Sequence, residues 1–216
     1  MNFWRLQGWL YEALFTLVPH RNLVANAASA VNWRTGVVLD AGCGTGKLSE
    51  FSECCVVGMD FSDTMLRVAK KRSSRLVRGN LSESLPFLNS TFSSVVSLNV
   101  LYALENPKGM IEEAYRVLEY DGELMLATPT SQRLMPLVSE HLRTATCKEI
   151  FVSILNIPRY IAWVFNLAIR GLFENSTFHF YTEAELVAMC ESVGFRVLQV
   201  TSCYAGIDAM IVARKE

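Results

Sequence analysis

The chain has 216 residues, six cysteines and a formal net charge of -1. This length suits one sizeable core, so we expect a single domain spanning 1–216. The balanced charge creates no long-range field that would attract a polyanion, which argues against nucleic acid as a partner. The cysteines show neither metal-ligand spacing nor a disulfide framework, and the N-terminus lacks a signal-peptide pattern. We therefore expect no metal and a cytoplasmic location.

A basic run, KKRSSRLVR, occupies residues 70–78. It follows a segment with helical spacing, and cations near a helix C-terminus complement the helix dipole. We interpret the run as a solvated helix end, and not as a contact for nucleic acid.

Short apolar runs alternate with helical segments along the middle of the chain. Residues 3–33 have helical spacing with a break at Pro19, and the buried-strand pattern TGVVLD follows at 35–40. Further strand patterns are CVVGMD (55–60), RLVRGN (75–80), SSVVSLN (93–99) and GELMLAT (122–128). Strands that alternate with helices indicate right-handed βαβ units, a parallel sheet and an α/β fold.

Two of the intervening helices are predicted from their own end signals. Residues 62–71 begin with a serine N-cap and end in lysines. Residues 107–122 carry acids early and close at a glycine. Both segments therefore predict helices that connect strands.

The C-terminal part contains one more helix and two strands. Thr182 and Glu185 form a capping box for a helix that stops at Gly194. The strand FRVLQV follows at 195–200, and AMIVARK at 209–215 is expected to return as its antiparallel partner.

A glycine-rich loop, DAGCGTG, follows the first predicted strand at 40–46. In open α/β sheets, ligands bind beyond the carboxyl ends of the strands. Gly42, Gly44 and Gly46 remove side chains from a tight turn and allow positive φ and close backbone approach. The loop therefore predicts a nucleotide-like ligand.

The neighbours of the loop discriminate between nucleotide classes. A dinucleotide fingerprint would need glycine at Lys47, and a P-loop would need glycine at Ala41 and a hydroxyl residue at Leu48. Asp40 would repel a pyrophosphate but suits a cationic ligand. Asp60 ends the second strand 20 residues later and can accept hydrogen bonds from both ribose hydroxyls, although a capping or turn aspartate is the alternative. A cationic nucleoside fits best.

Four segments in register resemble the successive motifs of class I S-adenosylmethionine-dependent methyltransferases. They are VVLDAGCGTGKLS (37–49), VVGMDFSDTML (56–66), GNLSESLPF (79–87) and FSSVVSLNVLYALEN (92–106). The chain is most similar to the small-molecule branch that includes ubiquinone/menaquinone and phospholipid N-methyltransferases, strongly over 35–128 and more loosely over 180–215. The resemblance implies a Rossmann-like, seven-stranded, mostly parallel sheet with helices on both faces, and S-adenosylmethionine as cofactor.

The resemblance also implies which residues bind the cofactor. They are Asp40, Gly42, Cys43 and Gly44 for the methionine part, Asp60 for the ribose, Phe61 and Met65 for the adenine faces, Asn80 and Leu81 for the adenine edge, and Asn99 and Val100 beside the methionyl group. Two positions depart from the family pattern: Asn80 stands where an acid is usual, and Tyr102 where a histidine is frequent. The carbonyl oxygen of Asn80 can still accept from an adenine amino group.

Catalytic residues are harder to assign, because displacement at a sulfonium methyl needs mainly proximity and alignment, and a general base is optional. His179 stands beside Tyr181 near a predicted lid boundary and could take a proton or bind a headgroup. A packed or exposed histidine is the alternative. Tyr11 could close over the methyl group.

Apolar segments point to the methyl acceptor. A helical lid insertion is predicted at 130–180, where this family often builds a substrate cover, and a helical cover at 1–33. Residues 150–169 contain 15 apolar residues in 20, but a proline and an arginine in the middle predict two helices and no membrane-spanning one. Arg159 and Arg170 flank the second helix, as in an interfacial or lid helix.

The predicted function is methyl transfer to a small, apolar or lipid-like acceptor such as a quinone, an isoprenoid or a phospholipid headgroup. The cover and lid either pack together as core or form an apolar tunnel or a membrane-contacting face. A non-catalytic cofactor-binding partner or sensor module is the alternative, although the loop and Asp60 are intact. Lys47 disfavours a nicotinamide oxidoreductase, and SLNVLY stands where amino-methylating nucleic-acid enzymes carry N/D-P-P-Y.

Overall fold

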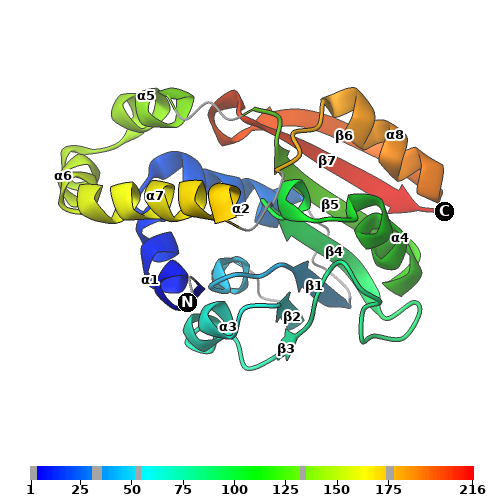
Figure 1. Cartoon of the computed structure of the whole chain (residues 1–216). Helices are drawn as coiled ribbons and strands as arrows, with labels where there is room; N and C mark the ends of the chain where they lie inside the picture. Colours follow the sequence, from blue (N-terminus) through cyan, green and yellow to red (C-terminus); the bar gives the residue numbers. More distant parts are fainter. Residues whose placement is uncertain (1–3, 31–35, 52–54, 132–134, 174–177) are drawn as a thin grey trace.

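A computed structural model of the chain describes residues 4–30, 36–51, 55–131, 135–173 and 178–216 (Figure 1). The ends of the predicted cover, at 1–3 and 31–33, and two parts of the predicted lid, at 132–134 and 174–177, lie outside the described residues.

A seven-stranded sheet runs through the centre of the molecule in the order β3-β2-β1-β4-β5-β7-β6. The strands are β1 (Val37–Ala41), β2 (Cys55–Asp60), β3 (Leu76–Arg78), β4 (Phe92–Leu98), β5 (Leu118–Pro129), β6 (Phe195–Cys203) and β7 (Asp208–Lys215). The first five strands in chain order pair in parallel, whereas β7 is antiparallel to both β5 and β6. The predicted Rossmann-like, mostly parallel sheet and its antiparallel last strand are confirmed.

Helices cover both faces of this sheet. The α-helices are α1 (Trp4–Leu14), α2 (Val18–Ala30), α3 (Asp63–Ala69), α4 (Pro107–Val117), α5 (Met135–Thr144), α6 (Cys147–Leu155), α7 (Ile157–Phe173) and α8 (Glu183–Val193), and the 3-10 helices are η1 (Lys47–Glu50), η2 (Leu101–Ala103) and η3 (Tyr204–Gly206). On β1, Leu39 and Ala41 join the core formed with α4 and α8, whereas Val38 joins the core formed with α2. Burial on both faces explains why the central strands read as continuous apolar runs.

The predicted end signals of α3 and α8 are confirmed. The Ser62 hydroxyl accepts from the Met65 amide at the start of α3. Thr182 and Glu185 form the reciprocal capping box of α8, and Gly194 ends that helix at a φ of 112°. These local signals work because each one satisfies or terminates the backbone of its own helix.

Two predicted boundaries are wrong. Helix α4 ends at Val117 and not at Gly122, because Leu118 already belongs to β5, where it pairs with Phe92. The N-terminal break precedes Pro19, which lies in the first turn of α2, where a helix tolerates proline. Gly122 predicts a helix end although strand pairing begins earlier, and Pro19 predicts a helix break although a helix can begin just before it.

The lid region forms α5, α6 and α7. Helices α6 and α7 meet at Asn156, which confirms the predicted pair, and Pro158 falls in the first turn of α7. Helix α7 lies along α1, at the end of the molecule that is farthest from α8 (Figure 1). Among the described residues, no helix is long and apolar enough to cross a membrane.

Candidate functional site

A cavity of about 730 Å³, here called the large cavity, opens where β1, β2 and β4 end. Residues predicted to bind the cofactor form much of its wall. They are Gly42, Gly44, Asp60, Phe61, Met65, Asn80, Leu81, Asn99 and Val100. Asp40 and Cys43 are buried and do not line it. Residues from four separate motifs therefore converge on one site.

The amides of the glycine loop are used within the protein. The Gly42 and Cys43 amides both donate to the Met59 carbonyl, at 2.8 and 2.9 Å, and the Gly44 amide donates to Asp60 Oδ2 at 2.9 Å. These three amides therefore do not form an anion cradle of the kind that holds a pyrophosphate. With these amides occupied, the groups of the glycine loop and its neighbours that can still contact a ligand are carbonyl oxygens and acids. Such groups bind a cation better than an anion.

Close packing between the β1 and β4 ends requires glycine at position 42. Gly42 has a φ of +83°, and a Cβ there would lie 2.3 Å from Val100 Cγ2. Asn99, just before Val100, also adopts a left-handed backbone with a φ of 55°, a conformation that asparagine tolerates. The two strand ends thus approach each other closely at the cavity floor.

Asp60 is fixed by backbone donors on both carboxylate oxygens. Oδ1 accepts from the Ser62 amide at 2.8 Å, and Oδ2 accepts from the Gly44 amide. The Phe61 amide is a third backbone donor to this carboxylate, which still has acceptor capacity where it lines the large cavity. The residue is therefore both a turn aspartate and a preoriented acceptor for ligand hydroxyls.

Buried acids give the cavity floor a cation-attracting character. Burial, together with the charge of Asp60, raises the pKa of Asp40 to about 7. Burial also raises the pKa of Asp60, and the backbone donors oppose that change. A positively charged ligand would stabilise the ionised form of both acids, so the site fits an ammonium or sulfonium better than a phosphate.

Comparison with known proteins identifies this arrangement. A family model described as a methyltransferase domain matches residues 39–126, from β1 to β5. These residues are a methyltransferase domain. The match includes the glycine loop, Asp60 and Asn99, so the residues that line the large cavity on the β1, β2 and β4 side belong to the domain.

Relatives of known sequence support this assignment. The chain is 36% identical over 88 residues to an uncharacterized protein of Methanocaldococcus jannaschii, a match that covers 41% of this chain and 42% of the relative. It is 29% identical over 192 residues to the demethylmenaquinone methyltransferase of Staphylococcus aureus, covering 82% of this chain and 75% of that enzyme. The chain thus spans less than half of the first relative and three quarters of the second.

Solved structures show the same fold. An S-adenosylmethionine-dependent methyltransferase of Thermotoga maritima superposes with a TM-score of 0.67 at 16% identity, covering 99% of this chain and 98% of that one. Magnesium protoporphyrin IX methyltransferase of Synechocystis, with bound SAH, gives 0.61 at 20% identity over 92% and 84%. The fold is that of class I methyltransferases, as predicted, and the methyltransferase-domain match is consistent with the predicted cofactor, S-adenosylmethionine.

The acids of the methyltransferase domain lead to a pH-dependence. The neutral form of Asp40 contributes stability at low pH that is lost as the pH rises toward its folded-state pKa of about 7. Cationic S-adenosylmethionine should favour the ionised acid, so binding should release protons and tighten, by up to ~10-fold per pH unit, from about pH 5 to about pH 7. Calorimetry in phosphate and Tris buffers would detect the released protons. Proton release should diminish in Asp40→Asn, and heats independent of the buffer would contradict the assignment.

The adenine side of the cavity keeps its predicted residues in place. Phe61 is half-exposed and Met65 is buried, and both line the wall. Asn80 accepts from the Ser82 amide at 3.1 Å and donates to Glu83 at 2.9 Å. The hydrogen bond from the Ser82 amide forms a turn that either an asparagine or an aspartate can make, because the side-chain oxygen of either residue can accept from that amide. This explains why an asparagine can stand where an acid is usual. The contact of Asn80 with adenine stays a prediction.

The three residues predicted to act in catalysis occupy different places. Tyr11 lines the large cavity beside Gly44, and burial raises the pKa of its phenol, so it stays protonated. His179 is exposed, and its amide donates to the Tyr102 carbonyl at 2.9 Å. Neither His179 nor Tyr181 lines the cavity, although Tyr102 does. The catalytic roles of all three stay predictions.

Asp208, at the start of β7, is a buried acid next to the site that the sequence reasoning missed; it does not line the large cavity, but its neighbour Asn99 does. Asp208 is 1% exposed, and burial raises its pKa to about 8. The Asn99 side chain is near enough to favour its charged form, yet neither carboxylate oxygen has a hydrogen bond of ordinary geometry among the described residues. A usable signal existed: an antiparallel strand begins at the edge where its parallel neighbours end, so an acid at that start reaches the ligand side.

The basic run also contributes more than a solvated helix end. Arg72 pairs with Glu50 and Glu12, the latter at 2.8 Å, and donates to the Thr45 carbonyl at 3.0 Å. It thereby ties the glycine loop and η1 to α1, next to Tyr11. Arg78 lines the large cavity. The interpretation of residues 70–78 as solvated is wrong for Arg72, whereas Arg78 is exposed.

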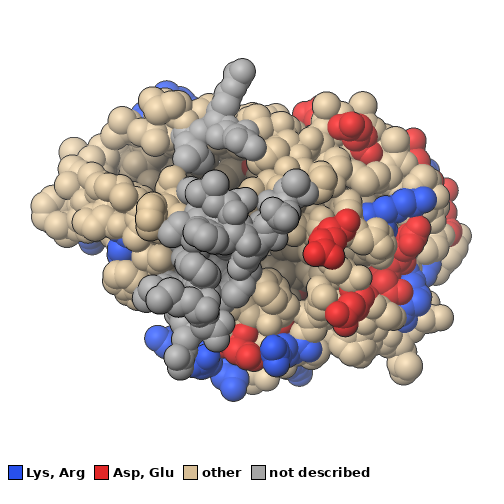
Figure 2. All heavy atoms as spheres, viewed as in Figure 1, with Lys and Arg blue, Asp and Glu red and all other residues tan. Residues whose placement is uncertain are grey.

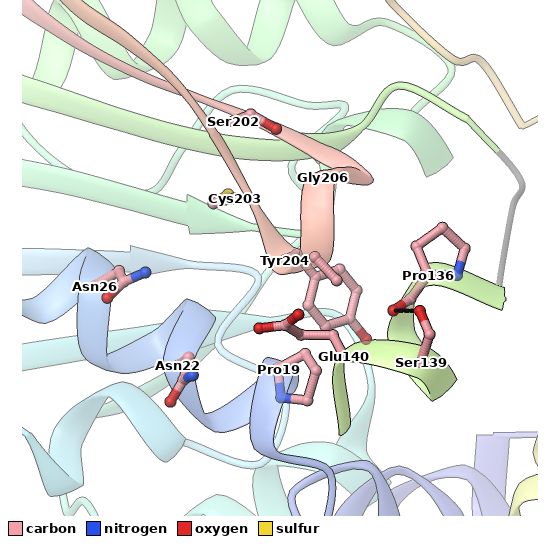
Figure 3. Close-up of a pocket in the computed structure, with 11 residues that line it drawn as sticks. Pro19, Asn22, Asn26, Pro136, Ser139, Glu140, Ser202, Cys203, Tyr204 and Gly206 are labelled. Atoms are coloured by element: carbon pink, nitrogen blue, oxygen red, sulfur yellow. Dashed lines mark hydrogen bonds between the residues drawn. The ribbon is translucent and has the colours of Figure 1, made fainter. Parts of the chain in front are cut away.

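A second hollow of about 370 Å³ lies between α2, α5 and η3 and shares no wall residue with the large cavity (Figure 3). Its wall is polar, with Asn22, Asn26 and Glu140 among its residues (Figure 3). Tyr204 lines it, and the Tyr204 hydroxyl lies 3.1 Å from Nδ1 of buried His20. The hollow is therefore separate from the large cavity, although His20 packs against Tyr11, which lines that cavity.

Proposed function

We propose that this chain transfers a methyl group from S-adenosylmethionine to a small, apolar, quinone-type acceptor. The observation that carries the proposal is the mixed wall of the large cavity. It combines Asp60 and the glycine loop with apolar and aromatic side chains, which are Leu98, Tyr102, Leu104 and Trp163. The 29% identity over most of the chain to a demethylmenaquinone methyltransferase supports a quinone-type acceptor.

The residues of the site would act mainly by positioning. The bound cofactor supplies an electrophilic methyl group, so the protein has to align an acceptor atom with it and exclude water. Asn99 Oδ1 is buried without a hydrogen-bond partner among the described residues, and it can accept from the ammonium of the cofactor. Tyr11 and Trp163, from α1 and α7, also line the cavity and would contact the acceptor.

A neutral Tyr11 restricts the acid–base chemistry. Because burial raises its phenol pKa, Tyr11 can donate a hydrogen bond to an acceptor oxygen but does not act as a phenolate base near neutral pH. An acceptor that loses a proton only after methylation would need no strong base at this position. Electron-rich quinols belong to that class.

The proposal can be tested with methyl-labelled S-adenosylmethionine and a panel of acceptors. We expect transfer to a water-soluble, short-chain demethylated quinol, and much less to phosphatidylethanolamine or to a polar amine. Preferred transfer to phosphatidylethanolamine would support a phospholipid headgroup instead. Cofactor binding without transfer to any acceptor would support the non-catalytic alternative.

Trp163→Ala should weaken acceptor binding specifically. Trp163 is the residue of α7 that lines the large cavity, and its loss removes a large apolar contact from the wall. We expect the KM for the quinol to rise about 10-fold, with the Kd for S-adenosylmethionine nearly unchanged. Tyr120→Ala, which removes an exposed aromatic residue at the start of β5, is the matched control. Equal effects of both variants would contradict the assignment.

A further inference from the structure

Large apolar side chains are exposed together on α6 and α7. They are Phe151, Ile154, Leu155, Ile161, Val164 and Phe165, each 43% to 65% exposed, and we call them the apolar ridge. Soluble monomers rarely leave so many large apolar side chains exposed side by side, and such patches mark contact sites. The ridge therefore needs an explanation beyond helix packing.

The inward faces of the same helices already have partners. The Tyr160 hydroxyl bonds to that of Thr16, Trp163 lines the large cavity, and buried Ser153 lies 2.9 Å from His141 Nε2. On α7, Ile161, Val164 and Phe165 follow the helical spacing of a separate stripe. The ridge is thus a second apolar face in addition to the one that packs on the protein.

The charges around the ridge suit an anionic surface. Glu140 and Glu149 are ion-paired with Arg143 and Arg21, respectively, so neither acid presents an uncompensated charge. Lys148 is exposed at the start of α6. Figure 2 shows almost no acidic side chains on the lobe that α6 and α7 form, whereas acids gather over α4 and α8.

An aromatic and cationic pair borders the ridge. Trp9 of α1 is 58% exposed, and the Arg159 guanidinium lies over its ring, 4.3 Å from the ring centroid. Tryptophan and arginine are common at the boundary between lipid headgroups and acyl chains, because each combines an apolar body with a polar end. Helix α6 lies at the outer end of the molecule, and α7 runs back from it toward the sheet (Figure 1), so the ridge includes an outer edge that suits shallow insertion into lipid.

We propose that the apolar ridge, bordered by Trp9 and Arg159, binds the surface of an anionic lipid bilayer. The apolar side chains enter the boundary between headgroups and acyl chains, and Lys148 faces the lipid phosphates. Arg159 donates to Asn156 Oδ1 and to the Trp9 carbonyl and so holds Trp9 at this boundary. Because Trp163 of the same helix lines the large cavity, an acceptor dissolved in the bilayer reaches the site from this side. That last step rests on the proposed function, whereas membrane binding itself does not.

The test is flotation of the full chain with vesicles of phosphatidylglycerol and phosphatidylcholine, compared with vesicles of phosphatidylcholine alone. The wild type should float with the anionic vesicles, and high salt should weaken binding only in part. The double variant Ile161→Glu/Phe165→Glu should bind at least ~10-fold more weakly, because two apolar side chains no longer enter lipid.

Leu198→Glu is the matched control, since it adds a charge at an exposed apolar residue of β6, outside the ridge. It should bind vesicles like the wild type. The ridge variant should keep its affinity for S-adenosylmethionine and its turnover of a water-soluble acceptor, which separates a membrane defect from a failure of folding or of the proposed function. Failure of the wild type to float would overturn the proposal. So would a wild-type dimer, seen by sedimentation, that the ridge variant dissociates, because a second copy would then cover the ridge.

Discussion

Asp60→Asn should bind S-adenosylmethionine at least ~100-fold more weakly than the wild type. Each hydrogen bond to a charged acceptor contributes about 1.5–3 kcal/mol, and we expect the Asp60 carboxylate, which lines the large cavity, to accept from the ribose hydroxyls. An asparagine has the same size, but its NH2 group replaces one carboxylate oxygen. This group donates instead of accepting, and it would face a backbone amide that is itself a donor. Isothermal calorimetry measures the loss directly.

The same variant separates binding from stability. Burial raises the pKa of Asp60, which means that the ionised carboxylate destabilises the cofactor-free protein. A neutral amide at this position does not have this destabilising effect. We therefore expect little change in the Tm of the cofactor-free Asp60→Asn variant. Asp121→Asn is the matched control, because Asp121 is exposed, far from the cavity, and has a left-handed φ of 61° that asparagine tolerates. Wild-type affinity in Asp60→Asn would disprove the ribose assignment.

The sequence predicts the fold well where a signal is local or repeated. Capping at Ser62 and Thr182 and the stop at Gly194 each depend on residues within one helix turn, so no distant contact can change them easily. The end of α4 shows the limit. Val117 passes directly into β5 because Leu118 pairs with Phe92 of β4, a contact across the sheet that no window around Gly122 contains.

The candidate site also contains residues that the sequence predicts and residues that it does not. Gly42, Asp60 and Asn99 follow predicted strands, and the carboxyl ends of parallel strands share one edge, so their convergence could be predicted. Asp208 was missed although it directly precedes a predicted antiparallel strand, whereas Trp163 could not be placed, because its position depends on how α7 lies against α1. Positions set by packing between distant segments need the structure.

The basic run at 70–78 illustrates why charge counts alone mislead. Its composition suits a solvated helix end, and Lys70 and Lys71 are indeed exposed. The side chain of the neighbouring Arg72 turns inward to Glu12 and Glu50. The run itself does not show which cation turns inward, since the acids that pair with Arg72 come from α1 and η1.

Gly42→Ala should abolish measurable binding of S-adenosylmethionine, a loss of at least ~100-fold. A left-handed backbone costs a residue with a Cβ about 1–2 kcal/mol, and this Cβ would in addition lie 2.3 Å from Val100 Cγ2. Relief of that contact must move the ends of β1 and β4 apart, at the floor of the large cavity. Binding is measured by calorimetry, and the Tm by calorimetric unfolding.

A matched pair of variants isolates the steric part of this effect. Gly206 has a similar φ of +77°, but a Cβ there would lie 3.9 Å from its nearest neighbour, Ser202 Oγ. Gly206→Ala should therefore carry only the cost of the left-handed backbone and keep wild-type cofactor affinity. Adding Val100→Ala to Gly42→Ala removes both methyl groups of the contact and should restore part of the binding. If the double variant binds no better than Gly42→Ala, close approach of the two strand ends is not what the glycine provides.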